Sequence, residues 1–311
     1  MDWLTYYNQP YVRLSDSDNF FSLIHIEISN DRLSVRIKNK DFDIDLFDIN
    51  AVWVWHGDIR FKDLSLKDVA QISQNAEVAF NLRSQMVTVY GFVEQYLDSK
   101  RIIGCPYRQN VNKLTLLRYA QEAGLHIPHT FISSSTGELR AFGAGRELIT
   151  KSIQESPFIH ANETKTILEG YTSEVKPGDF DKVNRDYIFP SLVQEKLDKK
   201  YELRIFYFYG KCYSMAIFSQ RDKQTEIDFR RYNNTKPNRM MKCSIPAELE
   251  AKIVQLMERA GLNTGSLDFV KTKEDKYIFL EVNAVGQFGF VSDACNYNLE
   301  KMIAEKLVSF C

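Results

Sequence analysis

The segment that most constrains the fold of this chain is residues 265–289, close to the C-terminus of its 311 residues. Within it lie two runs in which apolar and polar side chains alternate, 266–271 and 277–283, separated by the polar residues 272–276. Alternation on both sides of a short polar connection is typical of two paired strands. The segment therefore predicts a β-hairpin.

Three oxygen-bearing side chains lie inside this predicted hairpin: Asp268, Glu281 and Asn283. Glu281 and Asn283 are two residues apart, so they point to the same face of their strand. With a loop at 273–276, Asp268 lies directly opposite Glu281, with Cβ atoms about 5 Å apart. Two such carboxylates repel each other unless a cation lies between them, and oxygen ligands favour magnesium. We expect a magnesium and nucleoside triphosphate site; the alternative is a solvent-facing polar strand face.

The composition is ordinary for a globular protein, with 44% hydrophobic and 26% charged residues. The formal net charge of −1 argues against bulk binding of nucleic acid or anionic membranes. No apolar run approaches the length of a membrane span, and the N-terminus lacks the pattern of a signal peptide. The five cysteines are scattered, which predicts reduced thiols and a cytoplasmic protein.

The first third of the chain reads as α/β. Residues 51–55 form a nearly continuous apolar run, which predicts a strand buried on both faces. His56, Gly57 and Asp58 follow it, where loops of open α/β sheets often carry function, although a lone histidine at such a place is more often structural. Residues 66–97 have helical spacing throughout and predict one long helix.

The middle of the chain starts with a predicted helix for which Asn112 is the N-cap, and a later strand ends at Lys151. Residues 154–178 are polar and rich in turns, which is typical of a functional or disordered loop. A second hairpin is predicted with Gly210 and Lys211 as its loop. Its first strand carries Glu202 and Arg204 on one face, either as a placed pair or as a simple surface ion pair.

An amphipathic helix is predicted between Pro246 and Gly261, before the C-terminal hairpin. Residues 298–310 predict a final helix after the hairpin. The order of elements predicts an α/β start followed by α+β lobes with antiparallel sheets.

The chemistry-bearing residues occur in an order that resembles the ATP-grasp superfamily. They are Lys113, Lys151, Gln194, Glu195, Lys196, Leu197, Glu202, Arg204, Asp228, Arg230, Asp268, Glu281 and Asn283. Four longer segments are similar to those of the graspetide synthetases: DIDLFDINAVWVWHGD, NKLTLLRYAQEAGLHIPHT, AIFSQ…IDFR and EVNAVGQFGF. Within that group the chain most resembles the ATP-grasp ligase of the grasp-with-spasm peptide maturation systems. The likeness covers nearly the whole chain.

The resemblance implies an N-terminal α/β pre-grasp domain at 1–108, a central lobe at 109–190 and a C-terminal lobe at 191–311. In this fold, two antiparallel α+β lobes enclose ATP.

The resemblance also implies a role for each residue. Lys151 would reach the phosphates with support from Lys113, the segment Gln194, Glu195, Lys196 and Leu197 would read adenine, and Glu202 would bind the ribose. Asp268, Glu281 and Asn283 would hold two magnesium ions. Arg230 would stabilise the transferring phosphoryl group, with Arg204 and Arg221 as further candidates, and Asp228 would orient or deprotonate the nucleophile. The family usually has Trp where Phe229 stands.

The implied reaction is the ATP-dependent closure of rings in a ribosomally made precursor peptide. An Asp or Glu side chain becomes an acyl phosphate, and a Ser/Thr hydroxyl or Lys amine then displaces phosphate. A leader segment of the precursor would dock on residues 154–178 with Phe158 and Tyr171 as anchors, unless that loop is a disordered lid. The resemblance further implies a homodimer and a radical-SAM/SPASM-type maturation partner.

Two other functions stay open from the sequence. One is a carboxylate–amine ligase that adds free amino acids to a protein or small molecule. The other is a non-catalytic module that binds a nucleotide or a leader peptide.

Overall fold

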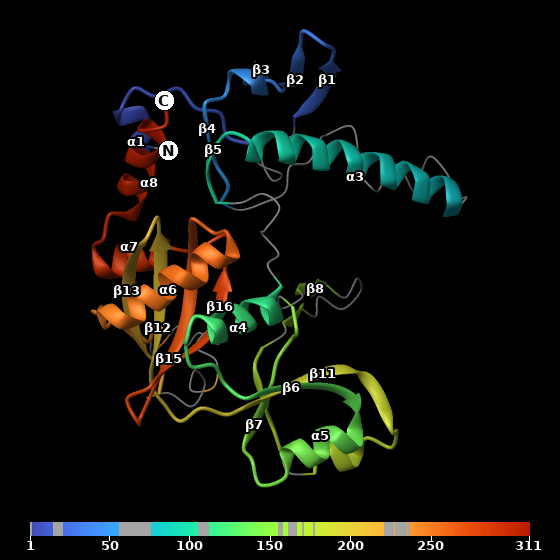
Figure 1. Ribbon diagram of the computed structural model, residues 1–311, viewed down its shortest axis with the longest axis vertical. Helices are drawn as coiled ribbons and strands as arrows, with labels where there is room; N and C mark the ends of the chain where they lie inside the picture. Colours follow the sequence, from blue (N-terminus) through green and yellow to red (C-terminus); the bar gives the residue numbers. More distant parts are fainter. Residues whose placement is uncertain are drawn as a thin grey trace. The chain divides into compact units, whose positions relative to one another are not determined.

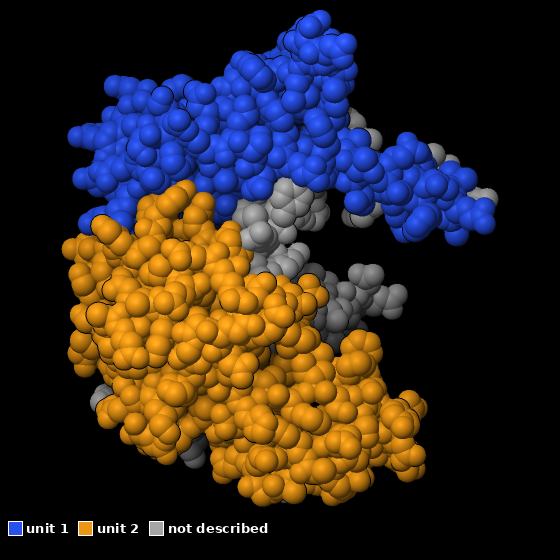
Figure 2. Space-filling view, viewed as in Figure 1, with its two compact units in different colours: residues 1–110, 284–289, 298–311 blue, residues 111–283, 290–297 orange. Residues whose placement is uncertain are grey.

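The computed structural model describes residues 2–14, 21–55, 76–104, 112–154, 158–160, 167–169, 171–176, 178–220, 227, 235 and 237–311. The chain divides into two compact units (Figure 2). Unit 1 comprises Met1–Asn110, Ala284–Gly289 and Asn298–Cys311, and unit 2 comprises Val111–Asn283 and Phe290–Tyr297. The boundaries at 108 and 190 stay a prediction.

Unit 1 contains a three-stranded antiparallel sheet and a parallel strand pair (Figure 1). Its elements are α1 (Asp2–Tyr6), β1 (Ser22–Ile28), β2 (Leu33–Lys38), β3 (Asp43–Asp45), the 3-10 helix η1 (Leu46–Asp48), β4 (Ala51–Trp53), α3 (Ala76–Asp98), β5 (Arg101–Ile103) and α8 (Leu299–Val308). Buried Val35 and Ile37 of β2 pack with Val93 and Leu97 of α3. This cluster is the core of unit 1.

The predicted strand at 51–55 is present but shorter, and the prediction that it is buried on both faces is wrong. The residues of β4 are half-buried, and Trp55 beyond it is 42% exposed. Within the described residues, β4 pairs with β5 in a sheet of two strands. The predicted helix at 66–97 is seen as α3, and residues 56–75 lie outside the described part of the chain.

Unit 2 holds two larger antiparallel sheets. The four-stranded sheet has the order β10-β7-β11-β6. Its elements are β6 (Thr130–Ser135), α5 (Thr136–Gly143), β7 (Leu148–Thr150), β10 (Ser173–Val175), η3 (Phe180–Lys182) and β11 (Tyr187–Glu195), with the separate pair β8 (Phe158–His160) and β9 (Ile167–Glu169) beside them in sequence. Leu139 and Phe142 of α5 pack on Leu148 and Val193 of the sheet.

The five-stranded sheet has the order β14-β13-β12-β15-β16. Its strands are β12 (Lys199–Phe208), β13 (Lys211–Phe218), β14 (Arg239–Lys242), β15 (Thr264–Thr272) and β16 (Tyr277–Asn283), and its helices are α4 (Lys113–Glu122), α6 (Ala247–Ala260) and α7 (Gly289–Cys295). Helix α6 lies against this sheet (Figure 1), and Met257 of α6 packs beside Gly265 of β15. Since Gly265 and Asp268 lie on opposite faces of β15, α6 covers the face that Asp268 does not use. These antiparallel lobes confirm the predicted fold class.

The second predicted hairpin is confirmed, but its loop is Tyr209-Gly210 rather than Gly210-Lys211. Phe208 pairs with Lys211, and both loop residues have positive φ, 44° at Tyr209 and 84° at Gly210. A two-residue turn with positive φ at both positions matches the twist of the flanking strands. The loop therefore ends at the glycine instead of starting there.

No helix in the described parts of the chain combines the length and the apolar character that crossing a bilayer requires. Four of the five cysteines are described, Cys212, Cys243, Cys295 and Cys311, and each is a free thiol.

Candidate functional site

The hairpin β15–β16 brings the three predicted metal-binding side chains to one face of the five-stranded sheet. Asp268 pairs with Glu281 and Ser266 pairs with Asn283. Since directly paired residues lie on the same face, and residues two apart share a face, all three side chains point the same way. The predicted hairpin and the predicted Asp268–Glu281 pairing are both confirmed.

The strand register between the loop and this pair differs from the predicted one, because β16 contains a β-bulge at Leu280. Near the loop, Lys271 pairs with Tyr277 and Phe269 with Phe279, one step away from the register that a loop at 273–276 gives. The register then shifts by one residue, so that Glu281 still faces Asp268. In a regular strand Phe279 and Glu281 would share a face; the bulge sends Phe279 to the core and Glu281 to the site.

Arg204 binds Asp268 from the neighbouring strand. Arg204 and Asp268 are directly paired across β12 and β15, and Arg204 Nη1 donates to Oδ1 at 2.8 Å and to Oδ2 at 2.7 Å. The two side chains are 7% and 16% exposed. The ring of Phe290 lies 5.7 Å from the guanidinium carbon and holds it in a cation–π contact. Arg204 is thus paired with Asp268 and not with Glu202, and it is held in a buried contact rather than in a simple surface ion pair.

Lys113 binds the other carboxylate. Its Nζ lies 2.9 Å from Oε2 of Glu281, and both side chains are about three-quarters buried, at 23% and 27% exposure. Lys113 is the first residue of α4, and the side chain of Asn112 caps this helix by accepting from Leu114 N and Thr115 N. The N-cap prediction is confirmed. The N-terminus of α4 also carries a partial positive charge, which favours anions near Lys113.

Glu202 lies in a buried network on the same strand as Arg204. Its Oε1 accepts from Lys199 Nζ at 3.0 Å and from Ser219 Oγ at 2.8 Å. Burial raises the pKa of Glu202, and the hydrogen bonds from Lys199 and Ser219 oppose this only in part. Lys199 and Ser219 were not singled out from the sequence. A β-bulge between Lys199 and Tyr201 puts Lys199 on the face of Glu202, a shift that no alternation pattern reveals.

The predicted adenine segment joins the two sheets of unit 2. The backbone N–H of Glu195 donates to His129 O at 3.0 Å, and that of Lys196 donates to Glu147 O at 2.9 Å. Gln194 is buried, and its amide nitrogen donates to Thr130 Oγ1 at 2.7 Å. Lys196 Nζ forms one ion pair with Glu174 of β10 and a second with Glu147, which lies just before β7. These bonds fix the backbone of residues 194–196.

Lys151 directly follows β7, the strand that pairs with β11 in this region. Val193 pairs with Thr150 and Gln194 with Ile149, so Lys151 lies one position beyond the paired residues and is half-buried. The register therefore places the predicted phosphate-binding lysine level with Leu192, two residues before the predicted adenine segment.

Several predicted residues lie outside the described part of the chain. They are Arg221, Asp228, Phe229 and Arg230, together with His56, Gly57 and Asp58. Their roles stay predictions. Phe158 lies in β8, and Tyr171 lies just before β10.

The described residues contain no group of three or more His, Cys, Asp and Glu side chains placed to hold one ion. The candidate set is instead two carboxylates and one amide, Asp268, Glu281 and Asn283. These hard oxygen donors fit magnesium, which binds few protein ligands and takes phosphate oxygens from its substrate. Arg204 Nε is buried and, in the described part of the chain, has no hydrogen-bond acceptor. An anion that reaches it satisfies this donor, so the residues present fit a magnesium–phosphate group.

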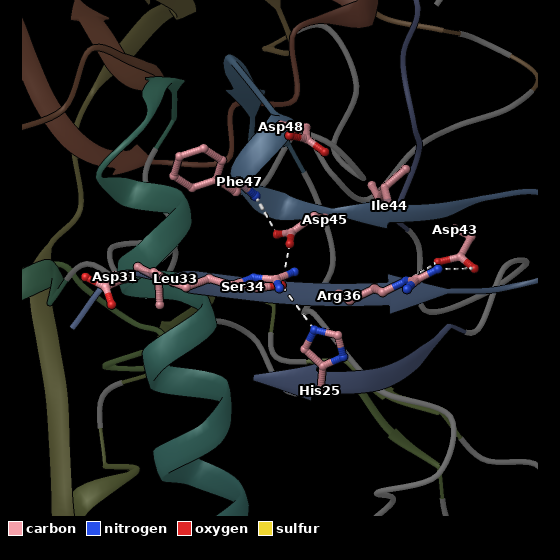
Figure 3. A pocket seen from close by; sticks show the side chains of 11 residues that line it. His25, Asp31, Leu33, Ser34, Arg36, Asp43, Ile44, Asp45, Phe47 and Asp48 are labelled. Carbon is pink, nitrogen blue, oxygen red and sulfur yellow. Dashed lines mark hydrogen bonds and ion pairs between the residues drawn. The ribbon is translucent and has the colours of Figure 1, made fainter. Parts of the chain in front are cut away.

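A hollow with a volume of about 580 Å³ lies on the three-stranded sheet of unit 1 (Figure 3). There, His25 Nε2 lies 3.1 Å from Ser34 Oγ, which donates to Asp45. Ser34 lies between His25 and Asp45 and is 2% exposed. Because its hydroxyl is buried, Ser34 is not a nucleophile activated by histidine. Asp45 also accepts from Val35 N and Phe47 N, which makes it a structural cap of η1.

No model of a known protein family matches the sequence, and no curated protein does so either. Solved structures do match it. A RiPP-associated ATP-grasp ligase of Chryseobacterium gregarium matches 100% of this chain and 92% of its own, with a TM-score of 0.82 and 21% identity. The macrocyclase MdnC of Microcystis aeruginosa MRC matches 99% of this chain and 94% of its own, with a TM-score of 0.77 and 21% identity. The ATP-grasp ligase PsnB matches 99% of this chain and 92% of its own, with a TM-score of 0.68 and 16% identity. The fold of this chain is that of the RiPP-associated ATP-grasp ligases.

Proposed function

We propose that this protein is an ADP-forming ATP-grasp ligase that closes ester or amide rings in a ribosomally made precursor peptide. The observation that carries the proposal is the convergence of Asp268, Glu281 and Asn283 on one sheet face within this fold. The Chryseobacterium ligase was solved with ADP and with a leader and core peptide, and MdnC was solved with its precursor peptide MdnA. PsnB was solved with magnesium and ADP.

In this proposal the nucleotide lies between the two sheets of unit 2. The N–H groups of Glu195 and Lys196 donate to protein carbonyls, so the N–H of Leu197 is the proposed donor to adenine. Glu202 binds the ribose hydroxyls, and this requires Lys199 or Ser219 to share its carboxylate. Lys151 binds the phosphates as a point charge.

Asp268, Glu281 and Asn283 would hold two magnesium ions, which would neutralise negative charge on the nucleotide phosphates. Arg204, Arg221 and Arg230 are the proposed stabilisers of the negative charge that develops on the transferring phosphoryl group. Asp228 is the proposed group that orients or deprotonates the nucleophile.

The reaction has two steps. A carboxylate oxygen of an Asp or Glu side chain of the peptide attacks the γ-phosphorus of ATP, ADP leaves, and an acyl phosphate forms. A hydroxyl or amine of the same peptide then attacks the acyl carbon, phosphate leaves, and the nucleophile loses its proton. The product is an ester or amide ring, and the protein contributes no nucleophile.

The leader of the precursor is proposed to dock on unit 2 around residues 154–178, which include β8, β9 and β10. Half-buried Tyr171 is a proposed anchor, and Phe158 is another. A homodimer, a radical-SAM/SPASM-type partner and a cytoplasmic location complete the proposal, with the scattered free cysteines in support of the last.

The test is to incubate the protein with ATP, magnesium and the peptide encoded by a short open reading frame beside its gene. Mass spectrometry should detect the loss of one water per ring, together with ADP. Gain of an amino-acid residue would instead indicate a ligase that adds free amino acids. ADP formation that persists unchanged in Glu281→Ala would indicate that the candidate site does not turn over ATP, as expected of a non-catalytic binding module.

A further inference from the structure

Both carboxylates of the candidate metal site already bind a protein cation. Asp268 accepts two hydrogen bonds from Arg204, and Glu281 lies 2.9 Å from Lys113. These four groups balance one another in charge. The arrangement therefore holds Asp268 and Glu281 close together without a metal ion.

The same pairs oppose the entry of a free divalent ion. An ion between Asp268 and Glu281 would lie next to two fixed positive charges, Arg204 and Lys113. Arg204 is 7% exposed and Lys113 is 23% exposed, so solvent and salt screen this repulsion only weakly. A divalent ion binds favourably here only if the two cations first find other anions.

The structure indicates where Arg204 can bind another anion. Its two hydrogen bonds to Asp268 come from Nη1, while Nε is buried and has no acceptor in the described residues. A guanidinium offers donors along a rigid fork, so an anion with several oxygens can bind at the Nε edge. Phe290 lies against the guanidinium at 5.7 Å and limits how far it can turn.

Lys113 also lies where an anion is favoured. It is the first residue of α4, where the helix dipole favours an anion, although Asn112 already accepts the N–H groups of Leu114 and Thr115. Its side chain is unbranched and flexible, so a small rotation moves Nζ from Glu281 to an oxygen near the helix end.

We propose that Arg204 and Lys113 are exchange cations. Without nucleotide, they neutralise Asp268 and Glu281; when nucleotide phosphates arrive, Arg204 binds them through its Nε edge and Lys113 through Nζ, and the two carboxylates are released to the divalent ion. The inference rests on the proposed function, because nucleotide phosphates are the arriving anions. It follows that the metal binds together with the nucleotide and not before it.

The test titrates Mn²⁺ alone into the full-length protein and follows free Mn²⁺ by electron paramagnetic resonance, with and without ADP. We expect wild-type protein to bind Mn²⁺ at least about tenfold more weakly without ADP. Lys113→Met and Arg204→Met should each tighten nucleotide-free Mn²⁺ binding by about tenfold, because each removes one repelling charge.

Two matched controls remove cations from exposed ion pairs of the same unit. Arg259 Nη2 lies 2.6 Å from Glu122, and Lys252 Nζ lies 2.6 Å from Glu248. Arg259→Met and Lys252→Met should leave Mn²⁺ binding unchanged. Circular dichroism checks folding, and Lys113→Met carries the test alone if Arg204→Met does not fold.

Equal Mn²⁺ affinity of the wild-type protein with and without ADP would overturn the proposal. So would an unchanged nucleotide-free affinity in the folded variants. A wild-type protein that fails to bind ADP even at saturating Mn²⁺ contradicts the proposed function itself, and the exchange with it.

Discussion

Arg204 and Asp268 face each other across two central strands, with Arg204 Nη1 2.8 and 2.7 Å from the two carboxylate oxygens. The pair is almost fully buried. Loss of one partner from such a pair leaves an uncompensated charge in a poorly solvated place. The pair therefore links the stability of the fold to the chemistry of the site.

The first prediction follows from this burial. Arg204→Met should lower the free energy of unfolding by about 3–5 kcal/mol, measured by urea-induced unfolding. Arg259→Met, which breaks an exposed pair, should cost less than about 1 kcal/mol. The double variant Arg204→Met/Asp268→Leu should recover most of the loss. Additive losses in the double variant would mean that the two charges do not depend on each other.

The second prediction separates binding from stability at Glu281. Glu281→Gln keeps the shape of the side chain but removes one of the two carboxylates, so affinity for the Mn²⁺–ADP complex should fall by about 100-fold or more. Because Lys113 and Glu281 are about three-quarters buried, the loss of their ion pair should lower the free energy of unfolding by about 1–3 kcal/mol. Calorimetric titration measures the affinity, with Glu248→Gln on α6 as a control that should bind normally. Normal binding by Glu281→Gln would remove Glu281 from the metal site.

The third prediction concerns pH and Glu202. Burial raises the pKa of Glu202 above its ordinary value of 4.5, so the folded protein holds this proton more tightly than the unfolded chain. The stabilising contribution of the protonated form is fully present below pH 4.5 and is lost as the pH rises through the raised pKa. The free energy of unfolding of wild type minus that of Glu202→Gln should therefore fall over that range. A difference that rises with pH would mean that Lys199 and Ser219 outweigh burial.

The fourth prediction tests the turn of the β12–β13 hairpin. Gly210 has φ of +84°, and a Cβ atom added there meets no heavy atom within 4 Å. Gly210→Ala should therefore cost only the backbone strain, about 1–2 kcal/mol, without changing ADP affinity. Gly104→Ala should cost more, because its Cβ would clash with the backbone oxygen of Val54 in addition to the strain. Thermal unfolding of the two variants compares the costs, and equal costs would contradict this account.

The sequence predicts the C-terminal hairpin well because its side-chain alternation is local and strong. Asp268, Glu281 and Asn283 share a face as expected, and Asn112 and Pro246 lie at the starts of their predicted helices. Such features depend on residues within a few positions of each other, which is the range that periodicity and capping rules describe.

Features that depend on strand registers were not predictable in this way. The bulge at Leu280 and the bulge beside Lys199 each add one residue to a strand, and each moves a charged side chain to the site face. The alternation of side chains along one strand does not reveal which residue is left unpaired at a bulge, because pairing with the partner strand determines it. The ion pair of Lys113 with Glu281 likewise joins residues far apart in sequence, and only the packing of α4 beside β16 brings them together.

The account depends most on one chemical claim, that this site transfers the γ-phosphoryl group of ATP to a peptide carboxylate. The direct measurement adds hydroxylamine to the protein, ATP, magnesium and the peptide encoded beside its gene, and analyses peptide and nucleotide together. We expect a hydroxamate on an Asp or Glu side chain, with hydroxamates and rings together equal in amount to ADP, and no hydroxamate in Glu281→Gln. A hydroxamate formed with AMP and pyrophosphate, or ATP turnover without any change to the peptide, would contradict the account.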